Sequence, residues 1–191
     1  MKILRVTGPE PLARVEPLLR EYVAWVFDGA QEHFGVRFAD RDAVVEERHA
    51  EFRATLPNLL AGRGRLILAT VGGVPAGVGA LKPVDAEVAE VKRMFVRPAA
   101  RGTGVGRAVL ERLLADTRGE GFHTVQLETF TFMRPALALY RSSGFVDVEG
   151  FEGSETATMG LRDRTCYLRR ELTRPAHGTP AGPKCGRPTP R

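Results

Sequence analysis

The chain has 191 residues, of which 43% are hydrophobic and 27% charged, and these fractions are typical of a single soluble globular domain. Its formal net charge is +5, but residues 173–191 hold four basic residues and no acidic one, which leaves the preceding part nearly neutral. These values disfavour a nucleic-acid-binding face and a membrane span, and two cysteines are too few for a disulfide framework.

The first 60 residues predict one strand and two helices. Residues 1–6 alternate like a strand and lack the long apolar run of a signal peptide. Residues 11–27 carry apolar side chains at helical spacing, and a second helix is expected at about residues 40–56, ended by Pro57. The connection between them, residues 28–38, is acidic and aromatic. It is either a surface loop anchored by its two phenylalanines or part of an acceptor pocket for a cation.

Strands dominate the next part of the chain. Residues 65–71 and 74–81 are rich in aliphatic and β-branched residues, and the two glycines between them favour a tight hairpin turn. A third strand, residues 87–96, is expected to run antiparallel to the second. A glycine-rich loop and a helix to about Gly119 follow. The remaining elements are expected at residues 123–129 (strand), 134–143 (helix), 145–148 (strand) and 165–172 (strand).

The most informative stretch joins the third strand to the helix that follows it. Residues 101–107 have the sequence Arg-Gly-Thr-Gly-Val-Gly-Arg. The first amides of a helix have no partner within it, and the helix dipole gives the same end a partial positive charge. Glycines let the backbone turn tightly and let a ligand approach closely, while the two arginines add full charges. The stretch therefore predicts a pyrophosphate-binding loop.

Two common phosphate-binding loops do not match this stretch. A Walker A loop requires Lys and then Ser or Thr after its last glycine, whereas Gly106 is followed by Arg107 and Ala108. A dinucleotide-binding loop has G-x-G-x-x-G soon after the first strand, whereas this loop has G-x-G-x-G near the middle of the chain. ATP, GTP and NAD are therefore disfavoured as ligands.

Two motifs resemble those of the GNAT superfamily of N-acetyltransferases. Its acyl-CoA loop has Arg or Gln, two residues, Gly, one residue, and Gly or Ala, and Arg101, Gly104 and Gly106 stand in these places. Residues 136–145 are similar to the family's A-x-x-L-Y-x-x-x-G-F segment, and the element order is collinear over residues 1–172. The resemblance implies an α/β (α+β) GNAT fold, in which a mixed, mostly antiparallel central sheet of about six to seven strands is flanked by about four helices.

The resemblance also implies which residues contact acetyl-CoA as co-substrate. Backbone groups near Phe95 and Val96, beside Met94, would admit the pantetheine arm and polarise the thioester carbonyl. Where the family often has Asn, this chain has Met133 before Arg134, and Arg134 is expected to meet a phosphate instead. The pyrophosphate would be bound by the loop residues Arg101, Gly102, Thr103, Gly104, Val105, Gly106 and Arg107. The histidines and cysteines lack metal-ligand spacing, so no metal is expected.

Glu90 and Tyr140 are the candidate catalytic residues. Family members often carry a glutamate near Glu90 that removes a proton from the amine through water, but Glu90 or Glu87 could simply solvate a strand edge or pair with an arginine. If the strand is regular, Glu90 shares a face with Lys92, Met94 and Val96. A phenol at Tyr140 would protonate the leaving CoA thiolate, whereas its position beside the helix's leucines also suits core packing.

The predicted activity is direct transfer of an acetyl group from acetyl-CoA to a primary amine, with a small molecule as the favoured acceptor. A protein N-terminus or lysine, a non-catalytic acyl-CoA sensor and an unrelated nucleotide-phosphate binder stay open. Residues 149–164 would discriminate among acceptors, since a small amine needs a closed pocket.

We expect a GNAT domain over residues 1–172 and a disordered Pro/Gly-rich tail over residues 173–191, in a cytoplasmic setting without nucleic-acid or membrane partners. Whether two copies form a homodimer is left open.

Overall fold

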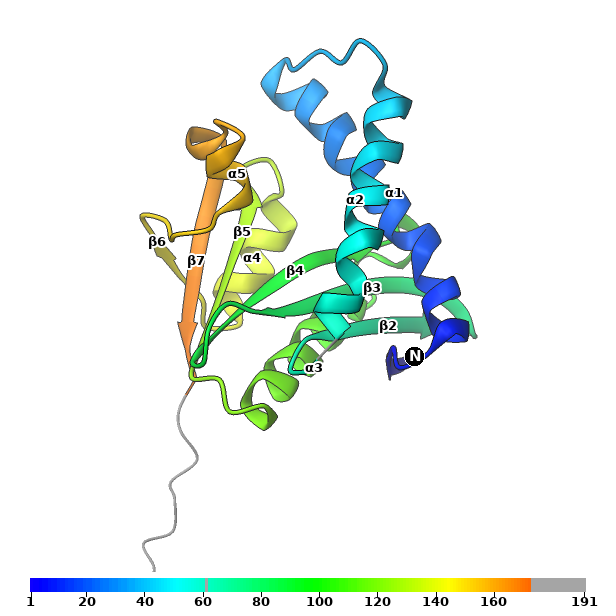
Figure 1. Ribbon diagram of the computed structural model, residues 1–191, viewed down its shortest axis with the longest axis vertical. Helices are drawn as coiled ribbons and strands as arrows, with labels where there is room; N and C mark the ends of the chain where they lie inside the picture. The colour runs from blue at the N-terminus through cyan, green and yellow to red at the C-terminus, as the bar shows by residue number, and fades with distance from the viewer. Residues whose placement is uncertain (61, 173–191) are drawn as a thin grey trace, which may run out of the picture.

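A seven-stranded mixed sheet forms the centre of the computed structural model, which describes residues 1–60 and 62–172 (Figure 1). Its strand order is β1-β2-β3-β4-β5-β7-β6, and all neighbours are antiparallel except the parallel pair β4 and β5. The predicted mixed, mostly antiparallel sheet is confirmed. The strands are β1 (Lys2–Arg5), β2 (Arg65–Val71), β3 (Val74–Pro83), β4 (Val88–Val96), β5 (Thr124–Phe130), β6 (Val146–Val148) and β7 (Thr165–Glu171).

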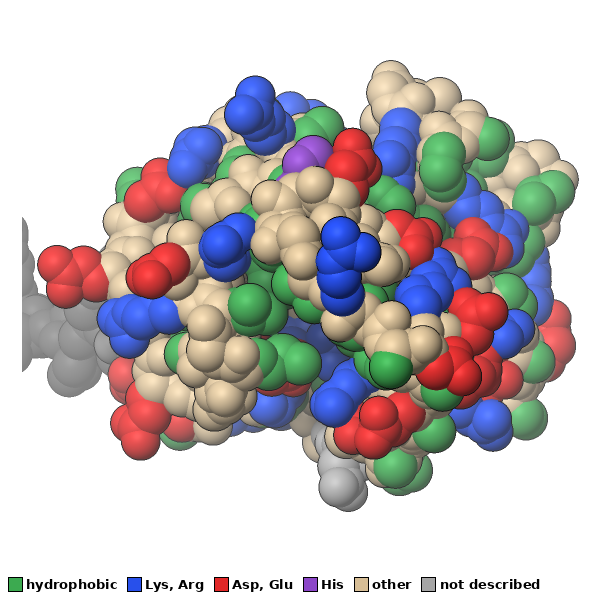
Figure 2. Space-filling model, turned by 90° about the horizontal axis from the view of Figure 1, so that it is seen from above, with side chains coloured by type: hydrophobic (Ala, Val, Ile, Leu, Met, Phe, Trp, Pro, Cys, Tyr) green, Lys and Arg blue, Asp and Glu red, His purple; other side chains and the backbone are tan. Residues whose placement is uncertain are grey.

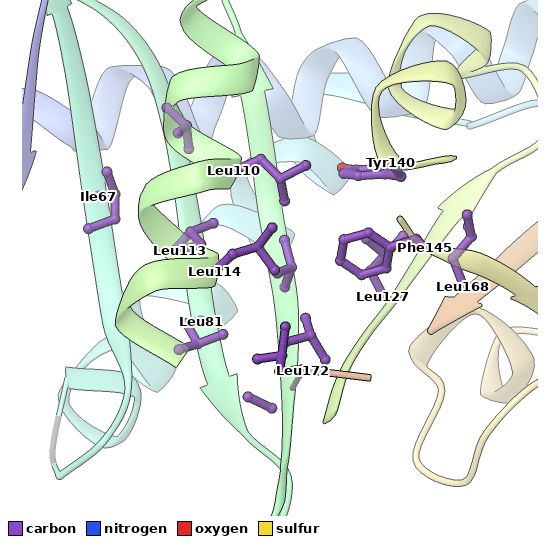
Figure 3. Packing of buried hydrophobic residues seen from close by; sticks show 14 of the residues in the cluster. Ile67, Leu81, Leu110, Leu113, Leu114, Leu127, Tyr140, Phe145, Leu168 and Leu172 are labelled. Carbon is purple, nitrogen blue, oxygen red and sulfur yellow. The ribbon is translucent and has the colours of Figure 1, made fainter. Parts of the chain in front are cut away.

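Helices cover both faces of this sheet. They are α1 (Pro9–Phe34), α2 (Arg41–Leu60), α3 (Val105–Gly119), α4 (Arg134–Ser142) and the short α5 (Glu155–Thr158), with 3-10 turns at Pro98–Ala100 and Arg162–Arg164. Alternate β2 residues serve the two faces, as the strand period requires: Leu66 packs with α1 and α2, and Ile67 packs with α3. Figure 3 shows the α3 side of this core. Among the described helices, none has the length and apolarity to cross a membrane.

The first two helices are longer than the sequence predicted. α1 continues through much of the expected connection and ends at Gly35, which adopts the left-handed conformation (φ 67°). Gly29 fits this helical stretch against Phe132, whose ring lies 2.5 Å from where a Cβ on Gly29 would be. α2 continues past Pro57, because the burial of Leu59 in the core beneath α1 and α2 offsets the hydrogen bond that a proline removes.

Two glycines in β3 let α3 pack directly on the sheet. An added Cβ would lie 2.8 Å from Val105 at Gly77 and 2.7 Å from Val109 at Gly79. Any larger residue would therefore push the helix outward. The close approach sets the start of α3 beside the outer half of β4.

β4 contains a β-bulge, which the sequence did not predict. Its partners in β3 shift between Val78, opposite Phe95, and Ala80, opposite Lys92, so two β4 residues face Gly79 alone. Arg93 lies in the bulge with φ 55°, the one described non-glycine residue with positive φ. The extra residue reverses the alternation of side chains beyond it.

The expected common face of Glu90, Lys92, Met94 and Val96 is therefore wrong. Ala89 and Val91 pack in the core under α3, and Met94 and Val96 border the same core, so Glu90 and Lys92 point to the other face. The bulge is the reason, because it places residues of both parities on one side. The predicted tail lies outside the described residues.

Candidate active site

β4 and β5 form a fork in the sheet. They pair in parallel at only three positions, of which Glu90 opposite Gln126 is the last, and then diverge (Figure 1). Beyond this point β4 pairs with β3, and β5 pairs with β7. The facing edges of the two strands therefore offer backbone groups that no ladder uses. Glu90 lies at the apex of this fork, and Phe95 and Val96 lie along its β4 arm.

The glycine loop turns back from the end of β4 and opens α3. Gly102 and Gly104 have φ values of 77° and 90°, which side chains with a Cβ rarely adopt. Gly104 is the N-cap of α3, and no side chain caps the amides of the first turn. These amides and the positive end of the helix dipole are therefore available for an anion. The Thr103 hydroxyl donates to the Ala100 carbonyl at 2.7 Å and stabilises the turn.

The side chains predicted to bind CoA differ from one another in their exposure and in their contacts. Val105 is buried in the core, so only its backbone faces the loop. Arg101 donates from Nε to the Val96 carbonyl at 3.1 Å, and its guanidinium lies 5.0 Å from the Trp25 ring centre. Arg107 is exposed beside Ser142 of α4. Arg134 is exposed at the start of α4, and it makes no side-chain hydrogen bond or ion pair within the described part of the chain.

Tyr140 lies in the core between α4 and the sheet, where its ring packs edge-on against Phe145 at 5.9 Å. Figure 3 shows its hydroxyl directed toward Leu110 of α3. Burial, and to a lesser degree the Tyr22 phenol, raise the pKa of Tyr140 well above its ordinary value. The hydroxyl therefore stays protonated and available as a donor.

Buried charged groups gather on the other face of the fork. Lys92, whose side chain is 9% exposed, has its Nζ 3.1 Å from Glu90, 2.9 Å from Glu155 and 3.6 Å from Glu128. The other carboxylate oxygen of Glu155 accepts from Arg93 at 3.2 Å. Three carboxylates from β4, β5 and α5 thus surround one lysine, and we call these four residues the carboxylate cluster.

Glu128 fixes the start of α5. Its carboxylate accepts from the amides of Glu155 and Thr156 at 3.0 and 3.3 Å, and from the hydroxyls of Ser154 and Thr156 at 2.6 and 2.8 Å. Ser154 in turn caps α5 by accepting from the Ala157 amide. The segment 149–164 is therefore anchored to β5 through one buried acidic side chain.

The carboxylates of the cluster differ in their proton affinity. Burial raises the pKa of Glu90, and the nearby Lys92 ammonium only partly counteracts this effect. Burial also disfavours the charge on Glu155, but Arg93 and Lys92 outweigh it and lower the pKa of Glu155. Glu90 is consequently the better proton acceptor of these two groups.

The surface above the fork is hollowed. Seen from above, the molecule has a depression near its middle, with hydrophobic and basic side chains deep inside it (Figure 2). The depression lies between the side that carries α5 and the side that carries α1 and α2 (Figures 1 and 2).

Comparison with known proteins places this arrangement in a family. The family model described as "Acetyltransferase (GNAT) family" matches residues 27–145, which is more than half of the chain. The chain belongs to the GNAT acetyltransferase family. The predicted family and fold are confirmed.

Curated relatives match the GNAT domain in part. An IAA acetyltransferase from Azospirillum brasilense is 42% identical over 85 residues, which cover 44% of this chain and 55% of that protein. YsnE from Bacillus subtilis, named as an uncharacterized N-acetyltransferase, is 35% identical over 99 residues, covering 51% of this chain and 62% of that protein. The chain thus spans little more than half the length of these relatives.

A solved GNAT structure supports the fold over a longer stretch. PaiA N-acetyltransferase from Thermoplasma acidophilum, solved in complex with coenzyme A, has a TM-score of 0.64 and 16% identity. The comparison covers 90% of this chain and all of that one. At this identity the likeness establishes the shared architecture and leaves the substrates open.

The GNAT resemblance indicates candidate residues for a donor side, and of the carboxylate cluster it indicates only Glu90 and not the other three members. Lys92, Glu128 and Glu155 carry no motif, and only the fold brings them together. The sequence contained one signal for this cluster. Glu128 lies in a β-rich stretch, where the strand period places its side chain on one face of the strand, and acidic residues inside strands are uncommon. Pairing it with Lys92 still required the order of the strands.

Proposed function

We propose that this protein transfers an acetyl group from acetyl-CoA directly to the primary amine of a small molecule. The observation that carries the proposal is the position of Glu90, a buried carboxyl at the apex of a fork whose β4 arm leads to a glycine loop and a helix N-terminus. Donor and acceptor could therefore enter from opposite faces of the sheet and meet in the fork.

The loop and the β4 arm would bind the donor. A pyrophosphate would accept from the amides at the start of α3, with Arg107 nearby to add charge. A backbone amide near Phe95 or Val96 would donate to the thioester oxygen, on which charge builds as the amine attacks. The bulge supports this role because it interrupts the regular ladder at Arg93 and Met94, directly before Phe95 and Val96.

The chemistry then needs three proton transfers. The acceptor ammonium loses one proton through water to Glu90, and its nitrogen forms a bond to the acetyl carbon. The carbon–sulfur bond breaks as Tyr140 donates a proton to the departing CoA thiolate, and the second proton that the nitrogen loses restores the Tyr140 phenol. The raised pKa of Glu90 supports its role, because a more basic carboxylate accepts the amine proton more readily.

The anchoring of residues 149–164 favours a small acceptor over a protein segment. α5 is held to β4 by Glu155, which pairs with Lys92 and Arg93, and to β5 by Glu128. A segment fixed in this way narrows the acceptor side of the fork. A protein terminus would need an open groove there instead.

A panel of amines tests this proposal. Release of CoA thiol would be measured with 2-phenylethylamine, spermidine, lysine amide and an alanyl peptide as acceptors. We expect turnover with at least one free amine and little with the peptide. Turnover with the peptide alone would indicate a protein acetyltransferase, and CoA binding without any turnover would indicate a sensor.

A matched pair of variants tests the base. Glu90→Gln should lower kcat with the best amine about 100-fold, the low end of general base catalysis, while leaving CoA affinity unchanged. Glu87→Gln makes the same chemical change at an exposed position before β4 and should retain full activity. Equal activities of the two variants would contradict the role of Glu90.

A further inference from the structure

Lys92 is the common partner of the three carboxylates in the cluster. It lies two residues beyond the apex of the fork and reaches Glu90 on its own strand, Glu128 on β5 and Glu155 on α5. Its ammonium is buried, and neither a CoA-binding motif nor the proposed proton transfers require it. Its position nevertheless connects Glu90 at the apex with Glu155 on α5.

The three carboxylates depend on Lys92 to different degrees. Glu128 already accepts from two amides and two hydroxyls, and its distance from the lysine is the longest of the three. Glu155 has Arg93 as a second cationic partner. Glu90 accepts from Lys92 at 3.1 Å and from no other side chain in the described part of the protein. Removing the lysine would therefore affect Glu90 most.

We infer that Lys92 is a positioning residue for the acetyl transfer, which holds the Glu90 carboxyl at the apex of the fork and couples it to the position of Glu155 on α5. The inference rests on the proposed role of Glu90 as the base. Lys92 itself transfers no proton. It contacts both the Glu90 carboxyl, which takes up the proton, and the Glu155 carboxyl, which helps to form the acceptor side.

Other charged and polar groups surround Glu90 from each neighbouring strand. Lys82 lies directly opposite it on β3, and Gln126 lies beside it on β5, where it accepts from Arg169 of β7 at 3.3 Å. Arg93 is next to Lys92 and adjoins Tyr22 of α1. Of these described cations, only Lys92 makes a hydrogen bond with Glu90. Removing Lys92 should therefore shift the pKa of Glu90 more than removing Lys82 does.

The coupling predicts shifts of opposite sign. Burial raises the pKa of Glu90 and Lys92 counteracts it, so Lys92→Met should move the Glu90 transition to higher pH. The expected shift is about one pH unit, the lower end of the effect of a neighbouring opposite charge. Glu155→Gln removes the competitor for the ammonium, so it should move the same transition to lower pH.

The experiment follows the carboxyl of Glu90 directly and so does not need the natural acceptor. Proteins with isotope-labelled glutamate carboxyl groups would be titrated by NMR, and Glu90→Gln would assign the Glu90 signal by its loss. Lys82→Met is the matched control, because it removes the same charge opposite Glu90 without removing a hydrogen bond. Lys92→Arg keeps the charge and should restore most of the original transition.

The pH dependence of catalysis should shift in the same directions as the titration of Glu90. With the most active amine of the panel, the acid limb of kcat/KM should move to higher pH in Lys92→Met and to lower pH in Glu155→Gln, and CoA affinity should not change. Because every variant is assayed with the same amine, a difference belongs to the enzyme and not to the titration of the acceptor.

Two results would overturn the inference. Equal shifts in Lys92→Met and Lys82→Met, or no shift in either titration or rate, would make Lys92 a structural residue only. If Lys92→Met does not fold, a Glu155→Gln transition that stays in place or rises contradicts the coupling. A different result would contradict the proposed function. Full kcat in Glu90→Gln would show that Glu90 is not the base, and Lys92 would then have no base to position, whatever the titrations show.

Discussion

The two sides of the fork are formed by different parts of the chain, one mainly by backbone groups and the other mainly by side chains. The proposed donor side is made by the backbone, since two glycines with positive φ and the open amides of α3 form its loop. The proposed acceptor side is made by side chains, since its charged groups come from β4, β5 and α5 and lie up to 65 residues apart in the sequence, from Glu90 to Glu155.

This difference determines how each side responds to substitution. A backbone-built loop tolerates changes in most of its side chains but not in its conformation, so glycines are its sensitive positions. A side-chain network in a buried place depends on each of its members, because removing one leaves the others with unpaired charges. Substitutions on the two sides should therefore change different measurable quantities.

Tyr140→Phe tests whether the donor side contains one essential side chain after all. The ring would keep its packing on Phe145, so stability should change little, whereas loss of the hydroxyl should lower kcat about 100-fold. Steady-state rates with saturating amine would measure this. An acyl donor with a more acidic thiol should reduce the loss, because a better leaving group needs less help. Near-normal kcat, with chemistry limiting, would leave Tyr140 a packing residue.

Gly104→Val should break the donor side by its conformation. The variant places a branched side chain in the left-handed region where the phosphates would lie, and CoA should bind about 30-fold more weakly, or about 2 kcal/mol. Calorimetric titration with CoA would measure it. Gly73→Val is the control, since Gly73 has a similar φ of 85° in the β2–β3 turn. If both variants weaken CoA equally, strain alone explains the loss.

Glu128→Gln should break the acceptor side by loosening α5. The amide cannot supply the negative charge that draws two amides and two hydroxyls together, so unfolding should become easier by about 1–2 kcal/mol. Urea unfolding would measure the loss, and the KM for the amine should rise more than that for acetyl-CoA. Glu152→Gln, an exposed change in the same segment, should do neither. Equal stability of the two variants would contradict the anchoring role of Glu128.

Removal of the tail should affect neither side. The composition of residues 173–191, rich in proline and glycine, predicts that they bury no core. A chain that ends at Arg174 should keep its melting temperature and its rate of acetyl transfer within error. A large loss of either would show that the tail contributes to the domain or to an assembly.

The predictive value of the sequence also differs between the two sides. The loop's place before a helix N-terminus was predicted because Gly104 and Gly106 act through local conformation, which a local motif encodes, while its binding of CoA stays a prediction. The approximate elements and their order along the chain followed from periodicity and resemblance, whereas the order of the strands in the sheet came from the structure. The carboxylate cluster could not be predicted, because Lys92 and Glu155 meet only after α5 returns to β4. The β4 faces were assigned wrongly because the bulge at Arg93 has no signature in the strand pattern.

That bulge also makes Arg93 a separable insertion in β4. In a chain without Arg93, Lys92 and Met94 would be neighbours on opposite faces, as they already are, and every flanking side chain would keep its present environment. The core would therefore remain intact while the outer half of β4 lost its extra bend. Deleting one residue would thus change the width of the fork and remove one cationic partner of Glu155, while the other β4 side chains keep their faces.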